Sequence, residues 1–244
     1  MATSLAGKRA LVTGGSRGLG RAFCSALAAA GARVAFTYAK DANAAADTLA
    51  ALPEGSRAQQ VSVLDSTGTR TLVRELETAW GGVDILINNA GINQNLPIAL
   101  LQEVDWDLVM DTNVKGAFLT TRAVLPGMIK RKCGVILNIG SLAGERVIEA
   151  PVHYSASKAA LRGMTQALAK EVARHNVRAL CLAPGLLDDG VGRSLPEHLL
   201  ADYLKHNALG RVGGVAEVAQ LAVFLVSDAN SFMNGETILM DGGL

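Results

Sequence analysis

The chain has 244 residues, 50% of them hydrophobic and only 18% charged, with a formal net charge of +1. A chain of this length and composition can bury a sizeable core, which excludes a disordered or fibrous protein. The near-neutral charge argues against a nucleic acid partner, and no stretch reaches the ~18 apolar residues that a membrane span requires, so we expect a cytoplasmic protein.

Strands and helices are expected to alternate along the chain. The apolar runs that predict strands are 9–13, 33–38, 58–63, 83–87, 135–140, 177–182 and 237–240. Helices are expected at 21–30, 42–52, 67–80, twice within 98–132, at 154–175, around 196–207 and at 215–227. Continuous apolar strands separated by helices indicate a parallel sheet with helices on both faces. We therefore predict an α/β fold, a single doubly wound Rossmann domain over residues 1–244 with a parallel seven-stranded sheet.

A glycine-rich turn, residues 13–20, follows the first expected strand. In a dinucleotide-binding fold this turn places pyrophosphate against the N-terminus of the next helix. Gly14 permits a tight turn, Gly18 lets the backbone approach phosphate, and Gly20 allows the helix to pack closely on the sheet. The turn has the spacing G-x-x-x-G-x-G and predicts a dinucleotide site.

The end of the second strand indicates which dinucleotide binds. An NAD site usually has an acid there, which binds the ribose 2′-hydroxyl. This chain has no acid before Asp41, whereas Arg17 and Lys40 could meet a 2′-phosphate. The pattern favours NADP(H), although Lys40 alone would be interpreted as a solvated surface lysine.

Tyr154 and Lys158 lie four residues apart, which places them on one face of a helix. An ammonium one turn from a phenol favours the phenolate and so assists proton transfer. Ser141, thirteen residues upstream of Tyr154, offers a second hydroxyl for a carbonyl oxygen. The Tyr–Lys spacing is common in helices, but together with Ser141 and the glycine turn it predicts a site that acts on a carbonyl group.

These motifs resemble those of the short-chain dehydrogenase/reductase family, and most closely those of the bacterial 3-oxoacyl-(acyl-carrier-protein) reductases. The resemblance covers nearly all of residues 5–243. The segments that carry it are 13–20, 88–91, Asn113, Ser141, Tyr154, Lys158, 184–185 and 241–243.

The resemblance implies a role for each catalytic residue. Tyr154 would protonate the carbonyl oxygen as hydride arrives from nicotinamide, and Ser141 would bind that oxygen. Lys158 would favour the ionised tyrosine and bond the nicotinamide ribose. Asn113 would kink its helix and hold a water of the proton relay. Without the resemblance, an N-cap or an interhelical hydrogen bond is an equal alternative for Asn113.

The resemblance also implies which residues contact NADP(H). Asn89 and Ala90 would line the adenine-side ribose, and Pro184 with Gly185 would begin a segment, about 185–214, that covers the nicotinamide and the substrate. The expected set is Gly14, Ser16, Arg17, Gly18, Leu19, Gly20, Tyr38, Ala39, Val63, Asn89, Ala90, Gly91, Tyr154, Lys158, Pro184, Gly185 and Leu187.

A few positions depart from the family pattern without touching the catalytic residues. Ser62 replaces an aspartate expected beside adenine, and Asp189 stands where a threonine usually meets the nicotinamide carboxamide. Glu145 and Arg146 make the loop before Tyr154 unusually charged; these charges are either solvated or in contact with a polar acyl chain. No metal site is expected, because the four histidines form no ligand cluster.

The resemblance implies NADPH-dependent reduction of a 3-oxoacyl thioester on an acyl carrier protein, in fatty-acid or polyketide-like biosynthesis. The alternatives are a reductase or dehydrogenase of a free ketone or secondary alcohol, and a cofactor-binding subunit of a hetero-oligomer with a related chain.

Two expectations concern partners. A homotetramer is expected, because the helices within 98–132 and 154–175 carry apolar residues on more faces than one sheet can bury. Two basic helix ends, Lys130, Arg131 and Lys132 and then Arg174 with His175, are expected to form one patch near the active-site mouth. The helix dipole alone would favour cations there, and the resemblance suggests docking of an acidic acyl carrier protein.

Overall fold

Seven parallel strands form one sheet in the computed structural model, which describes residues 4–189 and 197–244. The strands are β1 (Arg9–Val12), β2 (Arg33–Tyr38), β3 (Arg57–Gln60), β4 (Ile85–Asn88), β5 (Gly134–Ile139), β6 (Val177–Pro184) and β7 (Thr237–Met240). Their order is β3-β2-β1-β4-β5-β6-β7. The order reverses between β1 and β4, and ligands of such sheets bind outside the carboxyl ends of the strands at that point.

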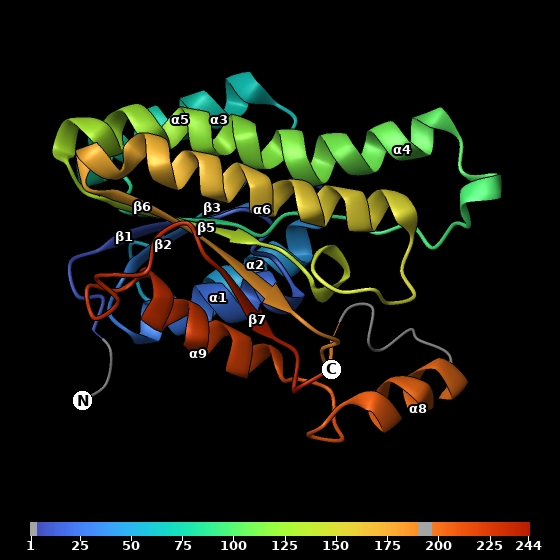
Figure 1. Cartoon of the computed structure of the whole chain (residues 1–244). Helices are drawn as coiled ribbons and strands as arrows, with labels where there is room; N and C mark the ends of the chain where they lie inside the picture. Colours follow the sequence, from blue (N-terminus) through green and yellow to red (C-terminus); the bar gives the residue numbers. More distant parts are fainter. Residues whose placement is uncertain (1–3, 190–196) are drawn as a thin grey trace.

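Helices cover both faces of the sheet (Figure 1). One face carries α3 (Ser66–Trp80), α4 (Glu103–Met110), α5 (Gly116–Arg131) and α6 (Val152–Val172). The other carries α1 (Gly18–Ala29), α2 (Ala42–Ala50) and α9 (Val215–Val226), while α8 (Glu197–His206) lies beyond the carboxyl ends of the strands. Single turns are η1 (Ile98–Leu100), η2 (Asp111–Lys115), η3 (Leu142–Gly144) and η4 (Ala173–His175).

Two apolar clusters fill the space between the sheet and its two helix layers. Phe23 of α1 and Phe36 of β2 belong to one cluster, whereas Met128 of α5 and Ile136 of β5 belong to the other. Successive residues of a strand point to opposite faces, so strands buried on both sides read as continuous apolar runs. The predicted doubly wound fold is therefore confirmed.

A few element bounds differ from the sequence expectations. The third strand was expected to reach residue 63, but β3 ends at Gln60 and the chain then turns toward Asp65. The Asp65 carboxylate caps α3 by accepting hydrogen bonds from the Thr67 and Gly68 amides, so the turn brings the capping residue to the start of the helix. The helix expected from residue 196 begins at Glu197 in the described part, and Pro196 lies outside the described residues.

Asp84 holds the amino ends of β1 and β4 together. Its carboxylate accepts hydrogen bonds from Arg9 Nε at 2.7 Å and from Arg9 Nη2 at 2.5 Å, and Arg131 Nε lies 3.8 Å away. The bond to Asp84 raises the pKa of Arg9. With an exposed side-chain fraction of only 6%, Asp84 forms a nearly buried ionic cluster at the edge of the sheet opposite to the carboxyl ends.

A chain of buried polar side chains crosses the layer between the sheet and the helices. Asn88 and Asn138 are register partners on β4 and β5, and Asn88 Nδ2 donates to Asn138 Oδ1 at 2.9 Å. Asn88 also donates to Thr121 of α5, and Asn138 donates to Thr165 of α6. The two strands and the two helices are thereby fixed relative to one another behind the carboxyl edge.

Among the described residues, no helix has the length and apolar character that crossing a membrane would require.

Candidate active site

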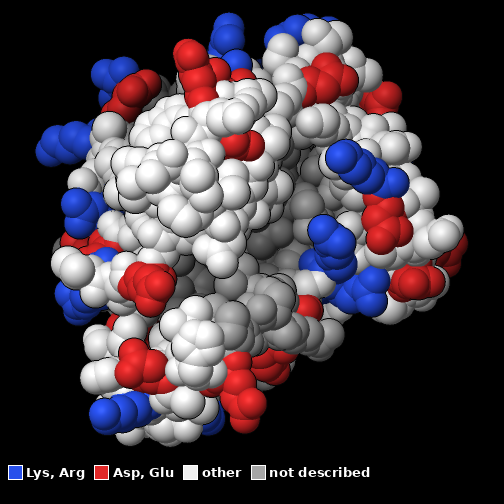
Figure 2. Space-filling model, turned by 90° about the vertical axis from the view of Figure 1, so that its right-hand side faces the viewer, with Lys and Arg blue, Asp and Glu red and all other residues white. Residues whose placement is uncertain are grey.

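The carboxyl edge of the sheet is hollowed in the space-filling view, and several Lys and Arg side chains stand along one side of the hollow (Figure 2). The glycine turn after β1, the segment after β4, the end of β5 with the start of α6, and the segment after β6 all reach this edge. These are the segments in which the sequence motifs lie.

The glycine turn adopts conformations that side chains disfavour. Gly14 and Gly18 have φ values of 68° and 55°, in the left-handed region where glycine is preferred. A Cβ at Gly20 would clash with the carbonyl oxygen of Gly14, which follows the expectation that this glycine permits close packing. The helix α1 begins at Gly18, three residues earlier than expected from the sequence.

Neighbouring elements hold the turn from behind. Thr13 Oγ1 accepts the amides of Asn89 and Ala90 at 3.0 Å each, and Asn89 Nδ2 donates to the carbonyls of Thr13 and Gly14. The carbonyl of Ser16 accepts hydrogen bonds from Arg21 and Thr48. The Asn89 amide group is thus used as a clamp on the glycine turn, in addition to the ribose contact expected from the sequence.

The turn fits a dinucleotide pyrophosphate. The N-cap residue of α1, Arg17, makes no side-chain hydrogen bond to the first turn of the helix. The first amides of a helix, with the positive end of the helix dipole, bind phosphate. Leu19 packs against the core beneath the turn, while Arg17 is exposed at its rim.

The last two residues of β2 differ in their access to the adenosine end of the site. Thr37 is 5% exposed, and its Oγ1 accepts the Gly14 amide at 3.4 Å. Side chains alternate along a strand, so Tyr38, which is half-buried, is the residue at the rim. Ala39 and Lys40 follow it and are exposed.

Val63, the other residue expected beside adenine, packs against α5. A Cβ at Gly116 would lie 2.6 Å from Val63 Cγ2, so the two segments approach closely.

Asn113 lies in the π turn η2, between α4 and α5. Its Oδ1 accepts the Ile92 amide at 2.8 Å, and its Nδ2 donates to the Ile92 carbonyl at 3.0 Å and to Ser157 Oγ at 2.9 Å. A π turn is a local widening of the helix that frequently occurs at functional sites. The expected helix distortion is therefore present at Asn113, and the relay water stays a prediction.

Tyr154 and Lys158 share one face of the first turns of α6. Lys158 Nζ lies 5.6 Å from the centroid of the Tyr154 ring and donates to the Ile139 carbonyl at 2.8 Å. Lys158 is 6% exposed, whereas Tyr154 is half-buried. Ser141 follows Ile139 by two residues at the carboxyl end of β5; it is half-buried, and its Oγ accepts the Ala143 amide at 3.2 Å.

Gly91 connects this group with Asn113. A Cβ at Gly91 would lie 3.1 Å from Asn113 Oδ1 and 3.7 Å from Lys158 Nζ, so the segment after β4 packs directly against both side chains. Ser157 completes the connection, because its hydroxyl accepts from Asn113 and donates to the Tyr154 carbonyl at 2.7 Å. Asn113, Ser141, Tyr154 and Lys158 therefore converge at the carboxyl edge.

The chain after β6 runs from the end of that strand toward the glycine turn. We call residues 185–189 the strap. Gly185 N donates to Met240 O at 2.9 Å at its start, and the Asp189 carboxylate lies 3.5 Å from where a Cβ of Gly18 would be. Leu187 packs against the core. The strap thus ends beside the first residue of α1.

The charged or ionisable side chains near the site differ in their partners. Glu145 accepts from Arg162 of α6 at 3.3 Å, while Arg146 is exposed. His153 is fully buried on α6, and neither ring nitrogen has a hydrogen-bond partner among the described residues. The position of the Glu145 carboxylate therefore favours a structural role over contact with an acyl chain.

The three cysteines are free thiols, and two of them are buried. Burial raises the pKa of Cys24 to about 12 and that of Cys181 to about 11, so both are neutral at pH 7.

Protein-family models show to which family this chain belongs. Residues 14–244 match the family model described as enoyl-(acyl carrier protein) reductase, which covers the glycine turn, the Tyr154 helix and the strap. The chain belongs to the short-chain dehydrogenase/reductase family.

Members of this family match the chain over its whole length. It is 35% identical over 241 residues to 3-oxoacyl-(acyl-carrier-protein) reductase FabG of Salmonella typhimurium, covering 99% of this chain and 98% of the relative. It is 36% identical over 244 residues to the enzyme of the same name from Thermotoga maritima, covering 98% of both.

A solved structure is also similar. A gluconate 5-dehydrogenase from Burkholderia cenocepacia, in complex with NADP and tartrate, has a TM-score of 0.92 and 33% identity, with 99% of this chain and 96% of that chain covered.

Within this short-chain dehydrogenase/reductase chain, one expectation about position is wrong. Asn176 Nδ2 donates to the Lys132 carbonyl at 2.9 Å, so the basic ends of α5 and α6 do lie side by side. A crossover helix runs antiparallel to the strands, however, and both ends lie at the amino edge of the sheet. From Tyr154 to Arg174 the helix spans roughly 30 Å at ~1.5 Å per residue, so the patch is far from the mouth of the same subunit.

Several residues that shape the site were missed by sequence reasoning. Ser157, Tyr203 and Asn207 carry no motif signal by themselves, because each acts through a hydrogen bond to the main chain or to a remote side chain. Thr13 was part of the expected glycine turn, but its hydrogen bonds to the Asn89 and Ala90 amides were not predicted.

Proposed function

We propose that this chain is an NADPH-dependent ketoreductase that reduces a 3-oxoacyl thioester carried by an acyl carrier protein. The observation that carries the proposal is the convergence of Asn113, Ser141, Tyr154 and Lys158 beside a glycine turn that fits pyrophosphate. Relatives named for this reaction, at 35% identity over nearly the whole chain, support it further.

Each side chain has a definite task in this reaction. NADPH, when bound, supplies the hydride. Ser141 binds the carbonyl oxygen, and Tyr154 donates a proton to that oxygen from the half-buried side of α6. Lys158 keeps a positive charge close to the phenol, which favours the phenolate that remains after proton transfer. Asn113 fixes the segment after β4 through its two bonds to Ile92.

The cofactor would lie across the crevice between β1 and β4. Gly14, Ser16, Gly18 and Gly20 would receive the pyrophosphate at the N-terminus of α1, and Arg17 with Lys40 would meet the 2′-phosphate at the exposed rim. The similarity to a gluconate 5-dehydrogenase solved in complex with NADP supports this choice of dinucleotide. We also propose a cytoplasmic location.

The activity is tested by following NADPH oxidation with a matched panel of 3-ketones, each offered as an acyl-carrier thioester and as a free ketone. We expect the carrier thioesters to be reduced with the higher kcat/KM. Equal or better turnover of the free ketones would contradict the carrier assignment, and no turnover of either would contradict a ketoreductase.

A second candidate is a reductase or dehydrogenase of a small hydroxylated ketone or alcohol. It is favoured by the amide-rich segment after β4, in which Asn93 and Gln94 follow the segment bonded to Asn113, and by the similarity to a gluconate dehydrogenase. Amide groups suit a substrate with hydroxyl groups better than a long acyl chain. The free hydroxylated ketones of the panel distinguish this candidate.

The basic helix ends provide a test of carrier docking. Lys132 and Arg174 are both exposed, and an acidic carrier bound at this patch would serve the site of a neighbouring subunit because its own lies roughly 30 Å away. Lys132→Glu with Arg174→Glu should raise KM several-fold for the carrier substrate and leave the free ketone unchanged. The effect should weaken with salt. An equal change for both substrates would contradict docking at the patch.

We also propose a homotetramer. The segment from η1 through α4 to the start of α5 exposes large apolar side chains, and a second group stands before β7. They are Ile98, Leu100, Val104, Trp106, Leu108 and Phe118, and then Phe232 and Met233. Apolar surface of this kind marks subunit contacts. Light scattering is expected to give four times the 25.4 kDa chain mass, and a stable monomer would contradict the proposal.

A further inference from the structure

The helix α8 is attached to the rest of the molecule mainly through polar contacts. All of its residues are described, and none of them is buried. Leu199, Leu200, Tyr203 and Leu204 are half-buried and lie on one face, whereas Lys205 and His206 are exposed. Half-buried leucines contribute only part of their burial energy, so apolar packing holds this helix weakly.

Tyr203 forms the contact between α8 and the strap. Its hydroxyl oxygen accepts the Leu186 amide at 3.1 Å, and it lies 2.7 Å from where a Cβ of Gly185 would be. The same Cβ would lie 3.1 Å from Asp241 Cα, so only glycine at position 185 leaves room for both the Tyr203 hydroxyl and the Asp241 backbone. The turn after Pro184 is therefore enclosed between α8 and the end of the chain.

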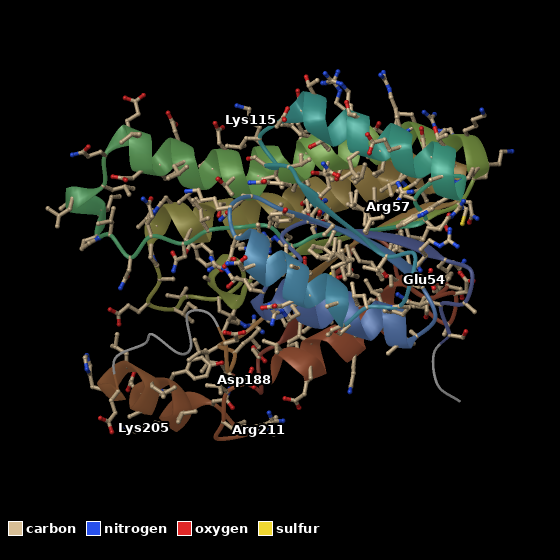
Figure 3. All side chains as sticks on the ribbon, turned by 180° about the vertical axis from the view of Figure 1, so that it is seen from behind. Glu54, Arg57, Lys115, Asp188, Lys205 and Arg211 are labelled. Carbon is tan, nitrogen blue, oxygen red and sulfur yellow. The ribbon has the colours of Figure 1, made fainter. Side chains whose placement is uncertain are left out.

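The Leu186 peptide groups show why this contact matters. The Leu186 carbonyl accepts the Gly213 amide at 2.9 Å, and the Asp188 amide donates to the Gly213 carbonyl at 2.9 Å. These bonds fix the middle of the strap to the segment before α9. The Leu186 amide is instead held by a side chain, the Tyr203 hydroxyl. Figure 3 marks Asp188 on the strap and Lys205 on the neighbouring α8.

A second polar contact holds the other end of α8. Asn207, directly after the helix, is 5% exposed; its Nδ2 donates to the Asp241 carbonyl at 2.6 Å and its Oδ1 accepts the Leu209 amide. This bond places the last turn of α8, and with it Tyr203, at a fixed distance from β7. The Tyr203 hydroxyl thus meets the strap from a supported position.

We propose that Tyr203 is a positioning residue for cofactor binding, whose hydroxyl holds the start of the strap over the nicotinamide side of the site. The proposal rests on the proposed function for the identity of the cofactor. Leu186 begins the strap that ends at Asp189, against Gly18 of the glycine turn. Loosening Leu186 would free the first part of a segment that must lie across the bound dinucleotide.

The test compares Tyr203→Phe, which removes only the hydroxyl, with Lys205→Ala, an exposed change on the same helix. Hydrogen–deuterium exchange on peptides that contain Leu186, in the cofactor-free protein, should be faster in Tyr203→Phe and unchanged in Lys205→Ala. The dissociation constant of NADPH, from its fluorescence, and its KM should rise about 3- to 10-fold, the usual effect of one hydrogen bond. The value of kcat should change less than about twofold, because Tyr203 does not touch the reacting atoms.

Unchanged exchange at Leu186 would overturn the proposal, since the hydroxyl would then not hold this amide. Faster exchange with unchanged NADPH dissociation constant and KM would also overturn it, because the contact would be structural only. The exchange and fluorescence measurements require no turnover. They decide the role of Tyr203 even if none of the 3-ketones is reduced, and reduction of these ketones would support the proposed function whatever Tyr203 does.

Discussion

The two edges of the sheet use their polar side chains in opposite ways. At the amino edge, the Asp84 carboxylate is surrounded by Arg9 and Arg131, so charge is neutralised where it stands. At the carboxyl edge, Asn113 and Lys158 bond to main-chain groups, and the Tyr154 hydroxyl is left accessible. One edge therefore stabilises the sheet, while the other keeps reactive groups fixed and available.

The largest expected effect is a loss of turnover at the carboxyl edge. Tyr154→Phe removes one oxygen and little volume, so the melting temperature should stay the same while kcat falls at least ~100-fold, the usual contribution of a general acid. At saturating NADPH, Tyr203→Phe is the control for kcat, because it removes the same atom from another tyrosine and should change kcat less than about twofold. A Tyr154→Phe enzyme with most of its activity would remove Tyr154 from the mechanism.

The next largest effect is a loss of stability at the amino edge. Asp84→Asn keeps the shape of the side chain but leaves Arg9, which is only 22% exposed, without its carboxylate. Removing one partner of a buried pair costs about 3–5 kcal/mol, and we expect about 3 kcal/mol in urea denaturation since Arg9 keeps its bond to the Trp80 carbonyl. The turnover per folded molecule should not change; a large drop in kcat would show that the two edges are coupled.

A smaller effect concerns the choice of cofactor. Tyr38→Asp places a carboxylate at the rim of the adenosine end, where it would repel a 2′-phosphate and accept the 2′-hydroxyl of NAD(H). The ratio of kcat/KM for NADPH over that for NADH should fall about tenfold, which corresponds to the loss of about 1.4 kcal/mol of charge interaction with the 2′-phosphate. Thr37→Ser, beneath the glycine turn, is the control and should leave the ratio unaltered. An unmodified enzyme that uses both cofactors equally would contradict the 2′-phosphate assignment.

The smallest effect lies at the start of α9. Glu217 accepts hydrogen bonds from Arg211 and from the Gly214 amide, which lower its pKa to about 2 from the usual 4.5. A carboxyl whose pKa is lowered on folding contributes stability above its unfolded pKa and loses it as the pH falls. The melting temperature should therefore decline slightly between about pH 4.5 and pH 2, and Glu217→Gln should remove that part of the decline. An identical pH profile in both proteins would contradict this.

Sequence patterns predicted the sheet and the clustering of motif residues well, because both depend on local periodicity and on the fixed geometry of parallel sheets. The second strand, Arg33–Tyr38, has the expected bounds. The direction of individual side chains was harder to predict from the sequence. Thr37, for example, faces the glycine turn. The basic patch was predicted at the carboxyl edge, near the active-site mouth, because of the family resemblance. It lies at the amino edge, because α5 and α6 run antiparallel to the strands.

The contacts of Tyr203 and Asn207 could not be predicted for a different physical reason. Each joins segments far apart in the sequence, Leu186 with α8 and Asp241 with the end of α8. Their geometry depends on how the chain folds back after β6, which no local pattern encodes.

The paired amides of Asn88 and Asn138 have a consequence for how the sheet finds its alignment during folding. Apolar strands of this length could pair in neighbouring registers with little difference in burial. A shift of one residue on either strand would turn its asparagine to the other face, away from Thr121 or Thr165, and would leave an amide without partners inside the protein. The two amides therefore select the correct pairing register of β4 and β5. Asn89 and Ser141 follow the carboxyl ends of these strands, so the register also sets their relative positions.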